Sequence, residues 1–82
     1  MIHIRSDYNQ RIQDSANLIP ADEPVFILRA QDKHAPATVA FWAHCVDQEG
    51  DFDLAIAALD HAIKMLQWQR KHGCKSPDSP SL

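Results

Sequence analysis

The chain has 82 residues, a formal net charge of −3 and 45% hydrophobic residues. This hydrophobic content argues against disorder over most of the chain, and no run approaches the roughly 18 apolar residues that a membrane-spanning helix needs. The eight Lys and Arg residues are spread along the chain, whereas binding a DNA duplex needs several clustered cations. We therefore exclude a membrane and duplex DNA as expected partners.

Length and cysteine content predict one small domain in a reducing compartment. Residues 1–73 form the predicted domain, and residues 74–82, rich in Pro and Ser, form a predicted flexible tail. Only Cys45 and Cys74 are present and no apolar signal run precedes a cleavage site, which favours the cytoplasm over secretion. A domain this short buries only roughly 60% of its unfolded surface, so additional stabilisation by oligomerisation is expected.

Two segments have the pattern of β-strands. In Met1–Ser6 the residues Ile2 and Ile4 alternate with polar residues, which predicts a short strand with one buried face. The segment Pro24–Ala30 has large apolar residues on both of its alternating faces, which predicts a strand covered on both sides. Its backbone must pair with Met1–Ser6, with the loop between them, or with a second copy of the chain.

Two amphipathic helices follow, over about Pro36 to Glu49 and about Asp53 to His72. Gly50 and Gly73 mark their ends, and Asp51 or Asp53 caps the second helix. Trp42, Leu59 and Ile63 are predicted to be interior. The predicted fold class is α+β, an antiparallel helical hairpin packed on a short β-sheet that a second chain completes, which makes the protein a homo-oligomer.

Neither metal binding nor catalysis is expected. Zinc sites usually take their ligands as close pairs at CxxC or HxxxH spacing, and neither pattern occurs among the candidate ligands His44, Cys45, His61, His72 and Cys74. No nucleophile elbow, HExxH, GxGxxG or P-loop pattern is present either. The prediction is a protein that is not an enzyme, with no catalytic residue, no metal and no cofactor.

Two short polar segments are candidates for binding a nucleotide-like ligand. A tyrosine can stack on a base, an amide can hydrogen-bond its edge, and an arginine can pair with phosphate. The predicted ligand-binding residues are Tyr8, Asn9, Arg11, Arg29, Gln31 and Asp32. Structural alternatives stay open, because Ser6 or Asp7 can cap a helical turn, Tyr8 can pack on the hairpin, and Asp32 can cap the next helix. Likewise, Arg70, Lys71 and Lys75 either bind phosphate or complement the dipole of the second helix.

Three segments, YNQRI from Tyr8, IPADEPVFILRAQD from Ile19 and VAFWA from Val39, together resemble a group of small proteins encoded by phages and prophages. The resemblance covers roughly Tyr8 to Trp42, continues more weakly to Gly73, and has RAQD as its most specific part. It implies a phage accessory protein in the host cytoplasm that acts against host defence.

The resemblance leaves two modes of action. In the first, the protein is a sponge that sequesters a small nucleotide-like immune signal without altering it. In the second, it is an anti-CRISPR-like inhibitor that binds a host defence protein. Its acidic residues would then imitate nucleic acid: Asp22, Glu23, Asp47, Glu49, Asp51 and Asp53. The inhibitor ranks second, because the chain has eleven acidic against eight basic residues, a small excess for charge mimicry.

Overall fold

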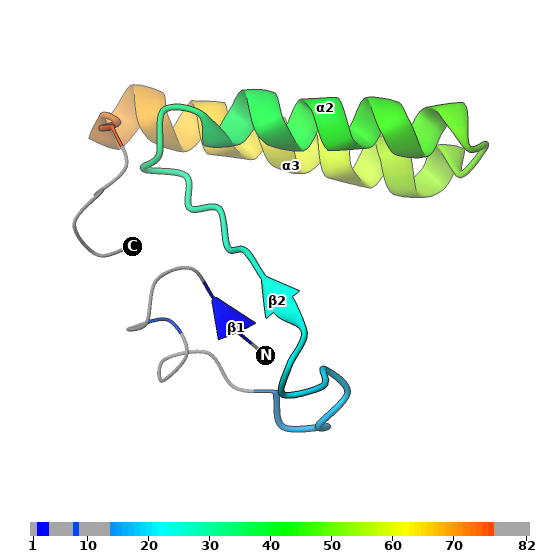
Figure 1. The fold of residues 1–82 in the computed structure, drawn as a ribbon. Coiled ribbons are helices and arrows are strands. Elements are labelled where there is room, and N and C mark those ends of the chain that lie inside the picture. The colour runs from blue at the N-terminus through cyan, green and yellow to red at the C-terminus, as the bar shows by residue number, and fades with distance from the viewer. Residues whose placement is uncertain (1, 4–7, 9–13, 77–82) are drawn as a thin grey trace. The chain divides into compact units, whose positions relative to one another are not determined.

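The computed structural model describes residues 2–3, 8 and 14–76, and the chain divides into two compact units (Figure 1). Unit 1 comprises Met1–Ile27 and Asp78–Leu82, and unit 2 comprises Leu28–Pro77. The two strands of the described residues belong to unit 1, and both long helices belong to unit 2. The prediction of a single domain over residues 1–73 stays a prediction.

Unit 1 contains one short pair of parallel strands. Strand β1, Ile2–His3, pairs with strand β2, Pro24–Val25, so that Ile2 lies opposite Pro24 and His3 opposite Val25. The chain between them is turned by Asp14, whose carboxylate accepts hydrogen bonds from the backbone N–H groups of Leu18 (3.1 Å) and Ile19 (2.7 Å).

The predicted strand Pro24–Ala30 is therefore much shorter than expected. Residues 26–29 have no regular secondary structure, and the Phe26 side chain is 62% exposed. Of the other predicted strand, residues 4–6 lie outside the described part. A sheet covered by the helical hairpin is not confirmed, because a two-residue pair offers too small a face for either helix.

Unit 2 is an antiparallel helical hairpin of two helices that lie side by side (Figure 1). Helix α2 runs over Ala35–Gln48 and helix α3 over Phe52–His72, each within one residue of the predicted bounds. Gly50 ends α2 with a φ of 91°, a left-handed conformation that favours glycine. Asp51 begins α3, because its carboxylate accepts a hydrogen bond of 3.2 Å from the N–H of Leu54. The helical hairpin is confirmed.

Small residues form the interface between α2 and α3. The buried residues of the two helices are Ala35, Pro36, Ala43, Val46, Ala55, Ala62 and Met65. The prediction that Trp42, Leu59 and Ile63 are interior is wrong, since their exposures are 50%, 49% and 46%. The physical reason is distance: alanine lets two helix backbones approach closely, and the larger side chains are then displaced to the flanks of the contact.

The chain beyond α3 returns to the start of the hairpin. Gly73 has a φ of 85° and donates its N–H to the carbonyl oxygen of Gln69 at 2.7 Å. Lys75 then donates its N–H to the oxygen of Gln31 (2.8 Å) and accepts the N–H of Lys33 at its own oxygen (3.0 Å). This part of the predicted tail is therefore hydrogen-bonded within unit 2, whereas residues 77–82 lie outside the described part.

Candidate functional site

The base of the hairpin is a loop whose backbone is fixed by Asp32. The N–H of Asp32 donates to the oxygen of Arg29 at 3.0 Å, and its own carbonyl oxygen accepts from the N–H of Ala35 at 3.0 Å. Its carboxylate also accepts from the N–H of His34 at 2.8 Å. Asp32 thus turns the chain just before α2, as its short acceptor side chain permits. The N-cap of this helix is His34, without a side-chain capping hydrogen bond, so the predicted cap by Asp32 is not formed.

Gln69 of α3 holds the same loop in place through two hydrogen bonds. Its Nε2 donates to the backbone oxygens of Ala30 (2.8 Å) and Asp32 (2.9 Å), two acceptors that are 39 and 37 residues away in sequence. The sequence analysis did not identify this residue. The available clue is its register, because Gln69 continues the interhelical series of Ala55, Ala62 and Met65 and is a polar residue in a core position.

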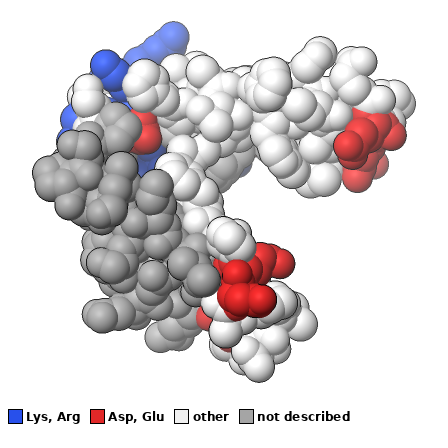
Figure 2. Space-filling view, in the orientation of Figure 1, with Lys and Arg blue, Asp and Glu red and all other residues white. Residues whose placement is uncertain are grey.

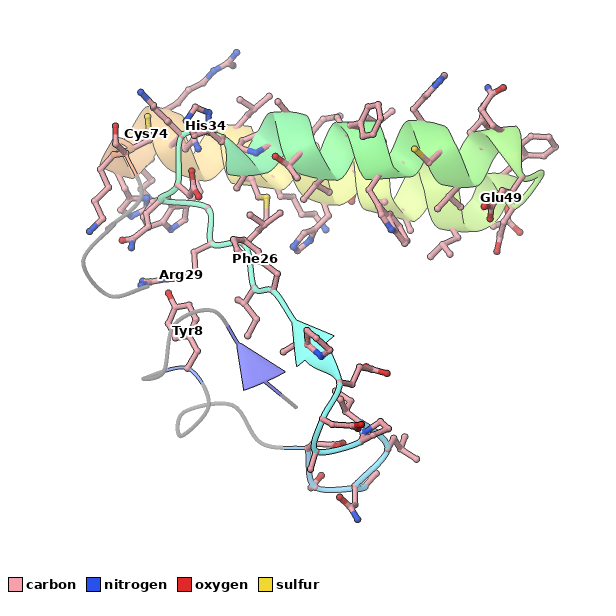
Figure 3. The ribbon with its side chains drawn as sticks, in the orientation of Figure 1. Tyr8, Phe26, Arg29, His34, Glu49 and Cys74 are labelled. Carbon is pink, nitrogen blue, oxygen red and sulfur yellow. The ribbon has the colours of Figure 1, made fainter. Side chains whose placement is uncertain are left out.

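Cations gather around this fastened loop. Five of the eight Lys and Arg residues lie at the base of the hairpin, and we call them the basic end: Arg29, Lys33, Arg70, Lys71 and Lys75. Four carboxylates lie around the turn between the helices, and we call them the acidic end: Asp47, Glu49, Asp51 and Asp53. Figure 2 shows this separation along unit 2, and in Figure 3 Glu49 lies at one end and His34 and Cys74 at the other.

An aromatic pair lies at the basic end. The rings of Trp68 and His72 stack with centroids 4.4 Å apart and planes inclined by 22°. The Nδ1 of His72 is also 3.1 Å from the carbonyl oxygen of Trp68. Trp68 remains 40% exposed, so this end offers an accessible aromatic surface beside its cations.

The predicted ligand-binding residues fall into two groups. Arg29, Gln31 and Asp32 lie together in unit 2, where Arg29 is exposed and the other two are half-buried. Tyr8 belongs to unit 1 and is only 6% exposed, so a ligand that stacks on its ring must first displace what covers it. Asn9 and Arg11 lie outside the described residues. The convergence of the two groups on one ligand stays a prediction.

A groove runs between the helices on one side of their contact. Its volume is about 340 Å³, and its walls are Ala40, Ala43, His44 and Asp47 of α2 and Ala55, Ile56 and Leu59 of α3. The α2 wall is built mainly from small or polar side chains, and the α3 wall carries the large apolar ones. The groove therefore has the shape and polarity to receive an apolar ridge from another helix.

Among the described residues, no three His, Cys, Asp or Glu side chains come together as a possible metal site. Cys45 and Cys74 are free thiols and both are exposed. Neither of the described helices has both the length and the apolar content needed to cross a bilayer.

Comparison with known proteins assigns no family. No protein-family model, no curated protein and no solved structure matches the chain. The function is therefore inferred from the chemistry of the residues and from the geometry of the hairpin, with the phage-protein resemblance as an expectation about its setting.

Proposed function

We propose that this chain is a non-enzymatic binding protein that captures a small, nucleotide-like anion at the basic end of its hairpin. The observation that carries the proposal is the gathering of five of the eight cations around a loop fixed by Gln69 and Lys75. Cations on a fixed backbone bind phosphate with little loss of conformational entropy on association. The resemblance to small phage proteins adds the setting, a sponge for an immune signal in the host cytoplasm.

Each predicted site residue has a role in this proposal. Arg29 pairs with phosphate, because a guanidinium presents a fork of donors that matches two phosphate oxygens. Gln31 hydrogen-bonds a base or ribose, and Asp32 fixes the loop that carries both. The roles of Tyr8 in stacking on a base, of Asn9 in hydrogen bonding and of Arg11 in pairing with phosphate stay predictions from the sequence. Arg70 and Lys71 lie in the last turn of α3, where cations also stabilise the helix dipole. Arg29 has no such position, so it is the more diagnostic cation.

The test is the release of a bound small molecule. The purified protein is incubated with a panel of cyclic and ADP-ribose-derived nucleotides, separated from free nucleotide, heat-denatured and analysed by mass spectrometry. We expect intact nucleotide from the wild type and from Lys64→Ala, a change of one exposed cation in the middle of α3. Arg29→Ala should release none while keeping its helical circular dichroism. If no nucleotide binds more tightly than about 10 μM, or ~7 kcal/mol, or if Arg29→Ala binds like the wild type, the proposal fails.

A second candidate function is inhibition of a host defence protein by direct contact. The observation in its favour is the large apolar surface of the hairpin, where nine large side chains are at least 40% exposed: Phe41, Trp42, Phe52, Leu54, Ile56, Leu59, Ile63, Leu66 and Trp68. Apolar patches of this extent mark interaction sites. Completion of the short β1–β2 pair by a second copy of the chain stays a separate prediction.

The Arg29→Ala variant separates the two candidates. An inhibitor that acts through the apolar faces keeps its stoichiometric host-protein partner in this variant and loses it in Trp42→Ser, a change of a half-exposed residue on α2. A sponge has the opposite pattern, because its ligand depends on the guanidinium.

A further inference from the structure

Helix α3 carries two parallel apolar stripes, one of mainly small side chains and one of large side chains. The inner stripe, which faces α2, consists of Ala55, Ala58, Ala62 and Met65, all buried or half-buried. The outer stripe consists of Phe52, Ile56, Leu59, Ile63 and Leu66, which are 44–66% exposed. Both stripes follow the alternating spacing of three and four residues that defines a heptad seam. The inner stripe forms the contact with α2, and the outer stripe has the spacing of a helix contact but no helix of the described residues covers it.

The groove beside the outer stripe has the complementary shape. Ala40, Ala43 and Ala55 give it a floor of small side chains, and Ile56 and Leu59 stand along its α3 wall. A second hairpin placed face to face would put its own large residues over this small floor, and the reverse contact follows by symmetry. Packing large residues against small ones fills an interface without voids. A two-fold dimer requires a surface that is complementary to itself.

The spacing of the outer stripe also fits an antiparallel two-fold contact. With Arg70 as its sixth position, the stripe runs 52, 56, 59, 63, 66, 70, and these intervals read the same in both directions. Leu59 then lies at the level of the partner's Ile63 along the helix axis, and Ile56 at the level of the partner's Leu66. The contact is apolar from Ile56 to Leu66, roughly 15 Å of helix, and Phe52 lies at the level of the partner's Arg70 at each end.

The charges of the hairpin favour the same orientation. An antiparallel pair brings the acidic end, with its four carboxylates, beside the basic end of the partner, with its five cations. A parallel pair would bring like charges together at both ends, which opposes association. Size, spacing and charge therefore all select one occupant in one orientation.

We propose that the outer stripe of α3 is covered by a second copy of this chain, and that the two hairpins pack antiparallel as a four-helix bundle. The apolar part of the stripe, Ile56 to Leu66, contains none of the predicted ligand-binding residues, and Phe41 of α2 lies off it. Dimerisation through this stripe therefore does not require the proposed ligand, and each proposal can fail without the other.

Sedimentation velocity of the purified protein tests the dimer. We expect twice the 9.3 kDa chain mass at micromolar concentration for the wild type. Ile63→Asp should raise the dissociation constant by about 100-fold or more, because it buries a carboxylate in the apolar contact. The matched control is Phe41→Asp, which places the same charge at a residue that is 68% exposed and off the stripe, and it should dimerise like the wild type. A monomeric wild type, or equal effects of the two changes, overturns the proposal.

Two additions keep the result unambiguous. Circular dichroism at matched concentrations checks that both variants are helical, and Leu59→Gln, a milder change at the centre of the stripe, should also weaken the dimer.

The orientation is measured by spin-labelling Cys74 in a Cys45→Ser background. Antiparallel hairpins place the two labels roughly 35–40 Å apart, given a rise of 1.5 Å per residue. A mean distance below about 20 Å indicates parallel hairpins and overturns the orientation.

Discussion

The inner and outer stripes of α3 have the same spacing, but they differ in residue size and in burial. The inner stripe is built from alanine and one methionine and is covered by α2, whereas the outer stripe is built from phenylalanine, isoleucine and leucine and is at least 44% exposed. Apolar size alone therefore does not decide which side of a helix becomes interior. Close approach of two backbones selects small residues, and the large residues form a second surface for association.

The two stripes also differ in the free energy that their burial contributes. A fully buried large aliphatic side chain contributes ~1.5–3 kcal/mol, and an alanine contributes much less because it has far less surface to bury. The hairpin contact is thus weak for its length, and covering the outer stripe adds stability that the inner stripe does not supply.

The largest expected effect is that of Met65→Ala, since Met65 is the largest side chain of the inner stripe and only 8% exposed. The change should lower the free energy of unfolding by ~2–5 kcal/mol. Urea denaturation followed by circular dichroism measures it, and Leu66→Ala, one residue further along α3, is the matched comparison.

Leu66→Ala should cost less than about 1 kcal/mol in dilute protein, because Leu66 is 44% exposed there. Its cost should rise with protein concentration as the dimer forms, and that of Met65→Ala should not rise to the same extent. Equal costs for the two changes at every concentration would mean that the stripes are not distinct.

A second change breaks the inner stripe by overfilling it. Ala62 is 3% exposed, and Ala62→Leu should lower the free energy of unfolding by ~1–3 kcal/mol because the helices must separate to hold the added carbons. The control is Ala57→Leu, an identical change at an exposed position of the same helix, which should leave the unfolding midpoint nearly unchanged. A stable Ala62→Leu variant would show that α2 and α3 do not approach closely at this point.

The smallest of the three effects concerns the polar end of the inner stripe. Gln69→Ala removes two part-buried hydrogen bonds to the loop at the base, each worth about 0.5 kcal/mol, the low end of the usual range. The unfolding midpoint should fall slightly, and amide exchange at Lys33 and Lys75 should accelerate. Gln67→Ala, at an exposed position, should change neither. Unchanged exchange in Gln69→Ala would show that the backbone bonds alone hold the loop.

The helix boundaries could be predicted from the sequence because their determinants are local. Gly50, Asp51 and Gly73 act within one turn of the positions they occupy, and the structure confirms all three roles. The interior could not be predicted in the same way. Trp42, Leu59 and Ile63 belong to apolar stripes that are wider than one contact, and a single sequence does not state which part of such a stripe faces its own partner helix.

The same distinction between local and distant determinants applies to the candidate site. Asp32 turns the chain just before α2 through bonds to near neighbours, so the sequence indicated its local role, although His34 and not Asp32 is the N-cap. Gln69 and Lys75 reach the same loop from more than 35 residues away. Periodicity places Gln69 in the interhelical series, but it does not say which loop either residue contacts. The strand Pro24–Ala30 was overestimated for a related reason, since strand length depends on a pairing partner that lies elsewhere.

The backbone bonds between Lys75 and the loop at residues 31–33 set an order on folding during synthesis. The ribosome delivers residues in sequence, so the segment that carries Arg29 emerges long before Lys75 exists to hold it. The turn at Gly50 and Asp51 brings α3 onto α2 once both helices have left the ribosome, and the loop closes only as the last of these steps. A chain that ends before residue 75 would thus contain both helices and lack the backbone bonds that fix the loop of the basic end, on which the proposed capture of an anion depends.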